Sequence, residues 1–191
     1  MADSVGTEIG RKVEEKDMSQ MNTSKIPAAT GALRIFVYGT LRAGRINYDR
    51  FCRGALYIED AAVWGRLYEL PSRIPVLQVP DSGIIAVGTS DPLADVKAQE
   101  RFNENPAADT PCDETCWRVI QGELMTFPDP RLSLPPIDRL EGFRPGLSCL
   151  YRRVLVPVVL DNDMRTAAAW CYVGDECTIQ RAVPTGKTCW P

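Results

Sequence analysis

The sequence predicts a mixed α+β domain built on one curved sheet or a small barrel. Short apolar runs rich in β-branched and aromatic residues outnumber helical patterns, and the two kinds of segment are interleaved irregularly. Glycines and prolines end most of the runs, as turns require. A length of 191 residues is enough for one domain with a hydrophobic core. No internal repeat is visible, which argues against a solenoid or a propeller.

Strands are predicted wherever an apolar run is bounded by turn residues, at residues 33–39, 61–70, 74–79, 84–87, 117–127, 150–160 and 167–173. Gly65 inside the second run indicates a bulge or a barrel bend, and Pro157 inside the sixth indicates an edge or a bulge. Short helices are expected at residues 47–52 and 135–140, the second one ending near Gly142.

Two segments differ from the rest of the chain. Residues 1–30 are polar and lack an apolar period, so they are expected to form a flexible N-terminal tail ahead of a domain at residues 31–191. Residues 89–117 are acidic and contain three prolines; they are predicted to be a solvated insertion loop with a helical turn at residues 93–102.

Composition excludes several classes of partner. The net charge is -3 and no cluster of Lys and Arg appears, which gives no basis for binding nucleic acid or an anionic membrane. No run of about 18 apolar residues is present to span a bilayer. The N-terminal stretch lacks the apolar core of a secretory signal, so a cytoplasmic location is expected. The sequence does not specify an oligomeric state.

The seven cysteines are odd in number and scattered, which does not describe a disulfide framework, so free thiols are expected. Cys149 and Cys171 lie in apolar runs and are expected in the core. Cys112 and Cys116 would need two more ligands to hold zinc, and the chain has no histidine to offer. No metal site is therefore predicted.

The absence of histidine restricts the chemistry further. It excludes Ser–His–Asp and Cys–His catalysis and the HExxH zinc motif within one chain. A reaction at neutral pH must then take its acid or base from Glu, Asp, Lys, Tyr or Cys.

Two motifs offer such chemistry. At residues 38–41 a strand ends in a glycine turn whose successive N–H groups can bind a carboxylate or an oxyanion, with the hydroxyl of Thr40 beside them. The alternative is a simple turn. Glu141 ends a short helix between Leu140 and Phe143, and apolar surroundings raise a carboxyl pKa from about 4.3 toward neutrality, as a general base requires. The alternative is a solvated glutamate at a helix end.

Other polar residues are expected to have ordinary roles. Glu123 offers a second carboxylate, but strand alternation can point it outward. Asp138 is expected to be exposed or to cap the helix. Arg152 and Arg153 point to opposite faces of a strand and are both expected to be exposed. Tyr151 and Tyr172 can supply hydroxyls to a pocket or pack in the core.

The motifs FVYGTLRAGRIN, GRLYEL, QGEL, IDRLEGF, YRRVLVPV and AWCYV follow one another in this order. Together they resemble the gamma-glutamylcyclotransferase-like family over about residues 33–173, and the YGTL turn resembles its gamma-glutamylamine branch. The resemblance implies a small mixed β-barrel flanked by short helices, with a glutamate as catalytic acid/base and a turn that binds the glutamyl group. The matching residues are Glu141 for catalysis and Tyr38, Gly39, Thr40, Leu41, Tyr151 and Tyr172 for substrate binding.

The resemblance also implies a reaction. The α-amino group of a small gamma-glutamyl substrate attacks its own γ-carbonyl, which gives 5-oxoproline and a free amine without metal or cofactor. Three alternatives stay open: a binding or regulatory module that has lost catalysis, a cyclotransferase that removes a gamma-glutamyl protecting group in a biosynthetic pathway, and a partner-binding protein that works through residues 1–30 and 89–117. The segment 89–117 is longer than the usual link in the family.

Overall fold

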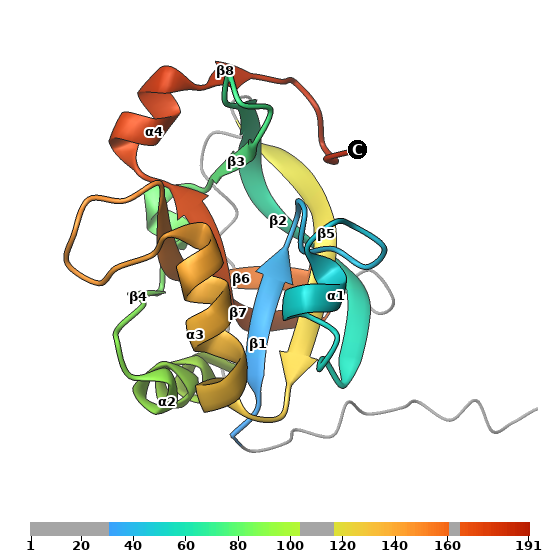
Figure 1. The fold of residues 1–191 in the computed structure, drawn as a ribbon, viewed down its shortest axis with the longest axis vertical. Coiled ribbons are helices and arrows are strands. Elements are labelled where there is room, and N and C mark those ends of the chain that lie inside the picture. The colour runs from blue at the N-terminus through green and yellow to red at the C-terminus, as the bar shows by residue number, and fades with distance from the viewer. Residues whose placement is uncertain (1–30, 104–116, 161–164) are drawn as a thin grey trace, which may run out of the picture.

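The computed structural model describes residues 31–103, 117–160 and 165–191 (Figure 1). The tail predicted at residues 1–30 and the pair Cys112 and Cys116 lie outside these ranges. The described strands are β1 (Leu33–Val37), β2 (Tyr57–Glu69), β3 (Pro75–Gln78), β4 (Ala86–Val87), β5 (Arg118–Phe127), β6 (Tyr151–Leu160), β7 (Thr166–Gly174) and β8 (Val183–Pro184). The described helices are α1 (Tyr48–Phe51), α2 (Pro92–Asn103), α3 (Pro130–Glu141) and α4 (Glu176–Arg181), with a 3₁₀ turn at Asp81–Gly83.

The strands close into a mixed barrel. The order β2-β5-β1-β7-β6 returns to β2, because β6 also pairs with β2. All of these pairings are antiparallel except that of β1 with β7, which is parallel. Closure removes the free edges that an open sheet would leave unpaired. The α+β fold with a small mixed β-barrel and short flanking helices, predicted from the sequence, is confirmed.

Alternation along the strands separates two apolar cores. One fills the barrel, because it takes a side chain from every barrel strand, such as Phe36, Val63, Leu124, Val156 and Cys171. The other lies between the outer face of the barrel and the helices, where Ile35, Met125 and Trp170 meet Leu134 and Ile137 of α3. Cys171 is buried, as expected, and Cys149 is only partly so.

Gly65 marks the point where β2 exchanges partners. Up to Gly65 the strand pairs with β5, and from Arg66 it pairs with β3. A Cβ at Gly65 would lie 2.7 Å from the carbonyl oxygen of Gln78, which no side chain tolerates. The strand thus needs glycine here for the close approach of β3.

Helix α3 begins earlier than predicted. The side chain of Asp129 caps it by accepting a hydrogen bond from the N–H of Arg131, and Pro130 occupies the first turn, where a missing N–H costs nothing. The sequence prediction started at Pro135 because Pro135 and Pro136 resemble a helix start; both lie inside the helix. Gly142 ends the helix with φ of 69°, in the left-handed conformation that favours glycine.

The helical turn predicted at residues 93–102 of the segment 89–117 corresponds to a longer helix, which is packed on the domain rather than solvated. Residues 92–103 form the three-turn helix α2, which packs beside α3 (Figure 1). Asp95, Val96 and Gln99 on one side of α2 are buried. Gln99 accepts a hydrogen bond from the N–H of Arg34 at 2.8 Å and donates one to the carbonyl of Ala32 at 2.9 Å, which ties α2 to the start of β1. The buried side of α2 carries the polar side chains of Asp95 and Gln99, so its packing could not be predicted from apolar periodicity.

The sequence analysis also missed α4 and β8. Asp175 caps α4 through a hydrogen bond from the N–H of Thr178, but six residues are too few for an apolar period to be detected. The chain after β8 follows the barrel, where Thr188 accepts a hydrogen bond from the N–H of Gln121 at 2.7 Å.

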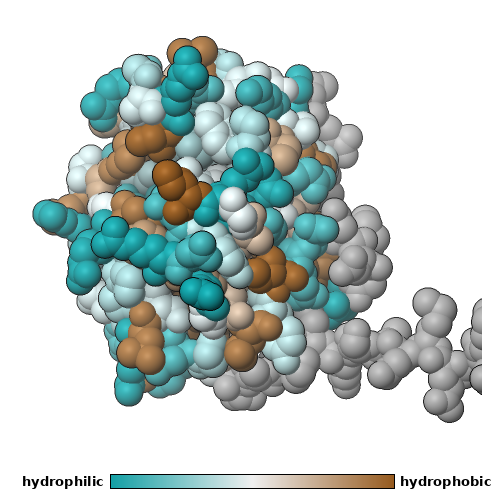
Figure 2. Space-filling view, turned by 45° about the vertical axis from the view of Figure 1, so that its right-hand side comes forward, coloured by the Kyte–Doolittle hydropathy of each residue, from teal (hydrophilic) through white to brown (hydrophobic). Residues whose placement is uncertain are grey.

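The surface carries no broad apolar area on the side shown in Figure 2, where hydrophobic side chains form separate patches between hydrophilic ones. Single exposed apolar residues, such as Ile46 and Leu132, are normal for a globular protein. Among the described helices, none is both long enough and apolar enough to cross a membrane.

Candidate active site

The turn predicted to bind a carboxylate follows directly on β1, at residues 38–41. Gly39 is required there, because a Cβ would lie 2.8 Å from Cγ of Pro75. Asn47 holds the turn by donating from its backbone to the carbonyl of Thr40 at 3.0 Å and from its side chain to the hydroxyl of Thr40 at 2.9 Å. Within the described residues, the N–H groups of Gly39, Thr40 and Leu41 donate to no acceptor. The turn therefore presents unpaired donors, as a site for an anion requires.

A buried carboxylate holds the residues that directly follow this turn. Glu123 of β5 accepts a hydrogen bond from the N–H of Ala43 at 2.8 Å and pairs with Nε of Arg42 at 3.4 Å. The outward orientation that alternation allowed is wrong, since only 8% of Glu123 is exposed. Gly122 lies against the end of β1, where a Cβ would come within 2.4 Å of the carbonyl oxygen of Val37. Glu123 thus anchors the chain that follows the turn.

Glu141 reaches the same place from α3. Its carboxylate lines a cavity with the turn and, within the described part of the chain, accepts no hydrogen bond. Burial raises its pKa from 4.5 to about 7. Of the two residues expected to shield it, Phe143 is buried but Leu140 is 37% exposed. The apolar walls beside Glu141 come instead from Phe36, Ile74 and other residues distant in the sequence.

Three tyrosines complete the cavity, and each hydroxyl donates to a protein acceptor. Tyr38 donates to the carbonyl of Tyr172 at 3.0 Å, and Tyr151 donates to the carbonyl of Pro75 at 2.5 Å. Tyr172 donates to the carboxylate of Asp138 at 2.7 Å. A ligand can therefore use these tyrosines only through their rings or as hydrogen-bond acceptors.

The groups that face Glu141 are neutral at pH 7. Burial, reinforced by Glu141 itself, raises the pKa of the thiol of Cys52 to about 12. The same two causes, burial first, raise the pKa of Tyr151 and of Cys171, while burial dominates those of Tyr38 and Tyr172, with smaller contributions from neighbouring groups. No cation among the described residues offsets the burial of Glu141. A carboxyl in this environment exchanges its proton near neutral pH.

The structure brings all the site residues predicted from the sequence to one cavity. Its volume is about 50 Å³, so only one end of a ligand fits inside and the remainder must lie at the mouth. The sequence analysis did not identify the apolar residues of the cavity, such as Phe36 and Ile74, because a short apolar run does not indicate which loop will pack against it. The lining consists of the predicted residues Tyr38, Gly39, Thr40, Leu41, Glu141, Tyr151 and Tyr172, together with Phe36, Val37, Ile74 and Pro75.

A larger cavity of about 700 Å³ lies on the other side of β6 and β7, lined by Arg152 and Val173. These are the chain neighbours of Tyr151 and Tyr172, so strand alternation turns them away from Glu141. One carboxylate of its lining, that of Asp175, already accepts hydrogen bonds from Thr178 and Ser148. The smaller cavity is the better candidate, because it alone of the two contains an unpaired carboxyl of raised pKa.

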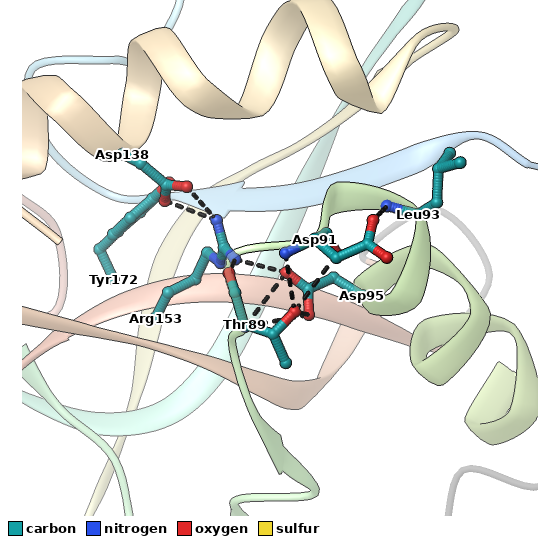
Figure 3. A network of polar contacts seen from close by, with 7 residues as sticks. All are labelled: Thr89, Asp91, Leu93, Asp95, Asp138, Arg153 and Tyr172. Atoms are coloured by element: carbon teal, nitrogen blue, oxygen red, sulfur yellow. Dashed lines mark hydrogen bonds and ion pairs between the residues drawn. The ribbon is translucent and has the colours of Figure 1, made fainter. Parts of the chain in front are cut away.

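Two predictions about charged residues are wrong. Arg153 is fully buried rather than exposed, and Asp138 is neither exposed nor a helix cap. Figure 3 shows them facing each other, with Asp138 also accepting from Tyr172. Arg152 is exposed, as predicted. Among the described residues, no group of three or more His, Cys, Asp or Glu side chains could hold a metal ion.

A family model matches part of the chain. Residues 35–90 match the model described as "Gamma-glutamyl cyclotransferase, AIG2-like". The matched residues include the turn at 38–41 and end before Glu141. The matched family is the one that the sequence motifs resemble. No curated protein matches the sequence.

Several solved structures are similar to the chain. An AIG2-like protein from Mus musculus is 17% identical, with 74% of this chain and 76% of that chain covered and a TM-score of 0.46. A protein from Arabidopsis thaliana is 17% identical, with coverages of 84% and 77% and a TM-score of 0.47. A gamma-glutamyl cyclotransferase specific to glutathione from yeast is 14% identical, with coverages of 75% and 69% and a TM-score of 0.39.

Proposed function

From the match of residues 35–90 to the gamma-glutamyl cyclotransferase, AIG2-like family model, we propose that the chain converts a gamma-glutamyl amine or amide into 5-oxoproline and a free amine. One observation carries the proposal. Glu141, whose carboxyl is unpaired, lines the same small cavity as residues 39–41, whose N–H groups donate to no acceptor among the described residues. Such a pair can bind an amino acid and move a proton within it.

The turn binds the acidic end of the substrate. Backbone N–H groups of Gly39, Thr40 and Leu41 donate to the α-carboxylate or to the oxygen of the γ-carbonyl, where negative charge develops during attack. Glu141 takes the cationic α-ammonium, and the tyrosine rings pack beside it. This arrangement folds the flexible glutamyl chain so that its nitrogen approaches its own γ-carbon. Well-oriented intramolecular reactions reach effective molarities of about 10⁵–10⁸ M, so positioning supplies most of the rate.

Glu141 moves the proton. It accepts one from the α-ammonium, and the freed amine attacks the γ-carbonyl carbon, forming the new C–N bond. In the tetrahedral intermediate Glu141 returns that proton to the leaving nitrogen, and the bond from the γ-carbon to the leaving nitrogen breaks as the carbonyl re-forms. The ring nitrogen then gives its remaining extra proton to the released amine, so the products are 5-oxoproline and an ammonium ion and the carboxylate of Glu141 is regenerated. A pKa of about 7 suits both directions of transfer. The nucleophile belongs to the substrate, so the chain needs no activated Ser or Cys.

The cavity also indicates where the leaving amine lies. Because about 50 Å³ is too little for more than one end of the substrate, the leaving amine lies at the mouth of the cavity, whose lining includes the exposed residue Ile74. The reaction can therefore accept leaving groups of different size.

The test is release of 5-oxoproline from a panel of gamma-glutamyl amines, gamma-glutamyl amino acids and gamma-glutamyl acyl compounds, followed by mass spectrometry. We expect wild-type protein to turn over at least one of these classes, and Glu141→Gln to lose roughly 10²–10⁴-fold in kcat, the usual contribution of general acid–base catalysis. Glu176→Gln is the matched control, since Glu176 is exposed on α4. Wild-type rates in Glu141→Gln, or no turnover by wild type of any class, would refute the proposal; tight binding of 5-oxoproline without turnover would favour a binding module.

A further inference from the structure

Helix α3 lacks two of its own backbone hydrogen bonds. Pro135 and Pro136 have no N–H to donate, so the carbonyls one turn earlier lose their helical partners. Glu141 is the last residue of the helix, whose end is closed by hydrogen bonds from the N–H groups of Gly142 and Phe143. Side-chain contacts on either side of Glu141 add to these backbone bonds.

Arg153 of β6 supplies those contacts on both sides of Glu141. Its Nη1 donates to both carboxylate oxygens of Asp138, each at 2.5 Å, one helical turn before Glu141. Its guanidinium also lies over the ring of Phe143, two residues after Glu141, with 4.7 Å from Cζ to the ring centroid. A side chain that contacts the chain before and after Glu141 restricts the direction in which that carboxyl points.

Arg153 is itself held by helix α2. Its Nη2 donates to the carbonyl of Thr89 at 2.7 Å and pairs with the carboxylate of Asp95, as Figure 3 shows. Asp95 is 1% exposed and accepts from both the N–H of Thr89, at 3.0 Å, and its hydroxyl, at 2.9 Å. Gly88 leaves the space for this arrangement, because a Cβ there would lie 2.6 Å from Nε of Arg153.

The buried charges in this cluster are paired with one another. Two carboxylates, Asp95 and Asp138, flank one guanidinium that water does not reach. Burial raises the pKa of both carboxyls, and the guanidinium opposes that shift. The cluster makes no direct contact with the cavity except through Tyr172, whose hydroxyl donates to Asp138. It is therefore built to fix geometry rather than to touch a substrate.

We propose that Asp95 and Arg153 are positioning residues for Glu141: Asp95 of α2 orients Arg153, which clamps Asp138 and Phe143 and so fixes the carboxyl of Glu141 in the cavity. The inference rests on the proposed function for its kinetic consequence. It assigns a role in the reaction to α2, which belongs to the segment that distinguishes this chain. It also separates Asp95 from the other acidic residues at the start of α2, such as Asp91, whose carboxylate accepts only from the N–H of Leu93.

Three variants test the clamp in different ways. Asp95→Asn removes the charge that orients Arg153, Arg153→Lys keeps the charge but loses the planar fork, and Gly88→Ala displaces the guanidinium without changing any charge. Asp91→Asn is the matched control, because it makes the same chemical change four residues away at an exposed position. Asparagine also serves well at a helix start, so this control keeps α2 intact.

The kinetic readout separates positioning from mere stability. At a temperature where every variant is folded, we expect kcat to fall about 10–10²-fold in the three variants, as a displacement near 1 Å can cause, with KM within about twofold. The acidic limb of the pH–rate profile should also move from about 7 toward 4.5, because a displaced Glu141 is better solvated. The control should match wild type in all three quantities. If the variants are less stable but keep kcat and the acidic limb of wild type, the cluster is only structural and the proposal is overturned.

A second measurement does not depend on turnover. The pKa of Glu141 can be followed by NMR of ¹³C-labelled glutamate side chains, with Glu141→Gln to identify its signal. We expect a value near 7 in wild type and in Asp91→Asn, and a lower one in Asp95→Asn and Gly88→Ala. An unchanged pKa in both variants overturns the positioning role even if the enzyme proves inactive on every substrate tried. Absence of turnover in wild type refutes only the proposed function, so the two failures are distinguishable.

Discussion

Asp138 and Glu141 stand one turn apart on the same helix and have opposite surroundings. Asp138 accepts hydrogen bonds from Arg153 and Tyr172, and the guanidinium compensates its charge. Glu141 faces the cavity with no hydrogen-bond donor among the described residues and no cation beside it. A helix turn of three residues thus carries one carboxyl that is fully paired and one that is left open.

The difference shows that the fold uses one carboxyl group to hold its neighbours in place and the other to exchange a proton. A paired carboxyl holds its neighbours in place, and removing its partner leaves an uncompensated charge in the interior. An unpaired one is costly to keep ionised, but its proton is free to move at neutral pH. We therefore expect removal of the partner of Asp138 to lower the unfolding free energy, and removal of the charge of Glu141 to raise it while proton transfer is lost.

The largest expected effect on stability comes from Arg153→Met. The substitution leaves Asp95 and Asp138 buried without a cation, and breaking a buried ion pair in this way costs about 3–5 kcal/mol of unfolding free energy. Chemical denaturation at pH 7 measures it. Arg152→Met is the matched control, since Arg152 is exposed on the opposite face of the same strand, and its change should stay within about 0.5 kcal/mol. Equal stability of the two variants would mean that the cluster contributes nothing.

Glu141→Gln should change stability with the opposite sign. The folded-state pKa of about 7 exceeds the ordinary 4.5, so folding disfavours the ionised form. Below pH 4.5 the carboxyl is protonated in both states and has no effect; the cost grows as pH rises from 4.5 to 7 and then stays constant. Removing the charge should therefore stabilise the protein above pH 7, by on the order of 3 kcal/mol.

Unfolding free energies of wild type and Glu141→Gln between pH 4 and 8 test this sign. The two curves should converge at the acidic end and separate as pH rises. A variant less stable than wild type at pH 8 would show that the glutamate is paired in the folded protein. The expected gain in stability accompanies the loss of turnover, which is the usual exchange at a catalytic group.

Local signals in the sequence predicted the helix end at Glu141 and the turn at residues 38–41, and the resemblance of the motif series assigned both to one site. A glycine after a buried strand predicts a turn with free N–H groups, and Gly142 after a short amphipathic segment predicts a helix end. The cluster around Arg153 could not be predicted in the same way. Alternation places Arg152 and Arg153 on opposite faces of β6, but only the packing of α2 decides which face is covered.

Long-range pairing limited the prediction of the fold as well. Every barrel strand was recognisable from its own apolar residues, although the ends of the longest strands were not. The pairing of Ala61 and Ala62 with Leu160 and Val159, which closes the barrel, joins segments about a hundred residues apart and leaves no local pattern. The resemblance of the motif series to a known family supplied that closure, where periodicity alone left an open sheet equally possible.

The smallest expected effect concerns the role of Tyr151, predicted to bind substrate. Its hydroxyl donates to the carbonyl of Pro75 in the cavity wall, so Tyr151→Phe should leave that carbonyl unpaired and cost about 1–2 kcal/mol of unfolding free energy. The ring stays in place, and KM should remain within about threefold of wild type. Tyr57→Phe, on an exposed tyrosine of β2, is the matched control for both measurements. A KM more than about tenfold higher at unchanged stability would instead mean that the hydroxyl turns from Pro75 to the substrate, and that the wall of the cavity rearranges when the site is occupied.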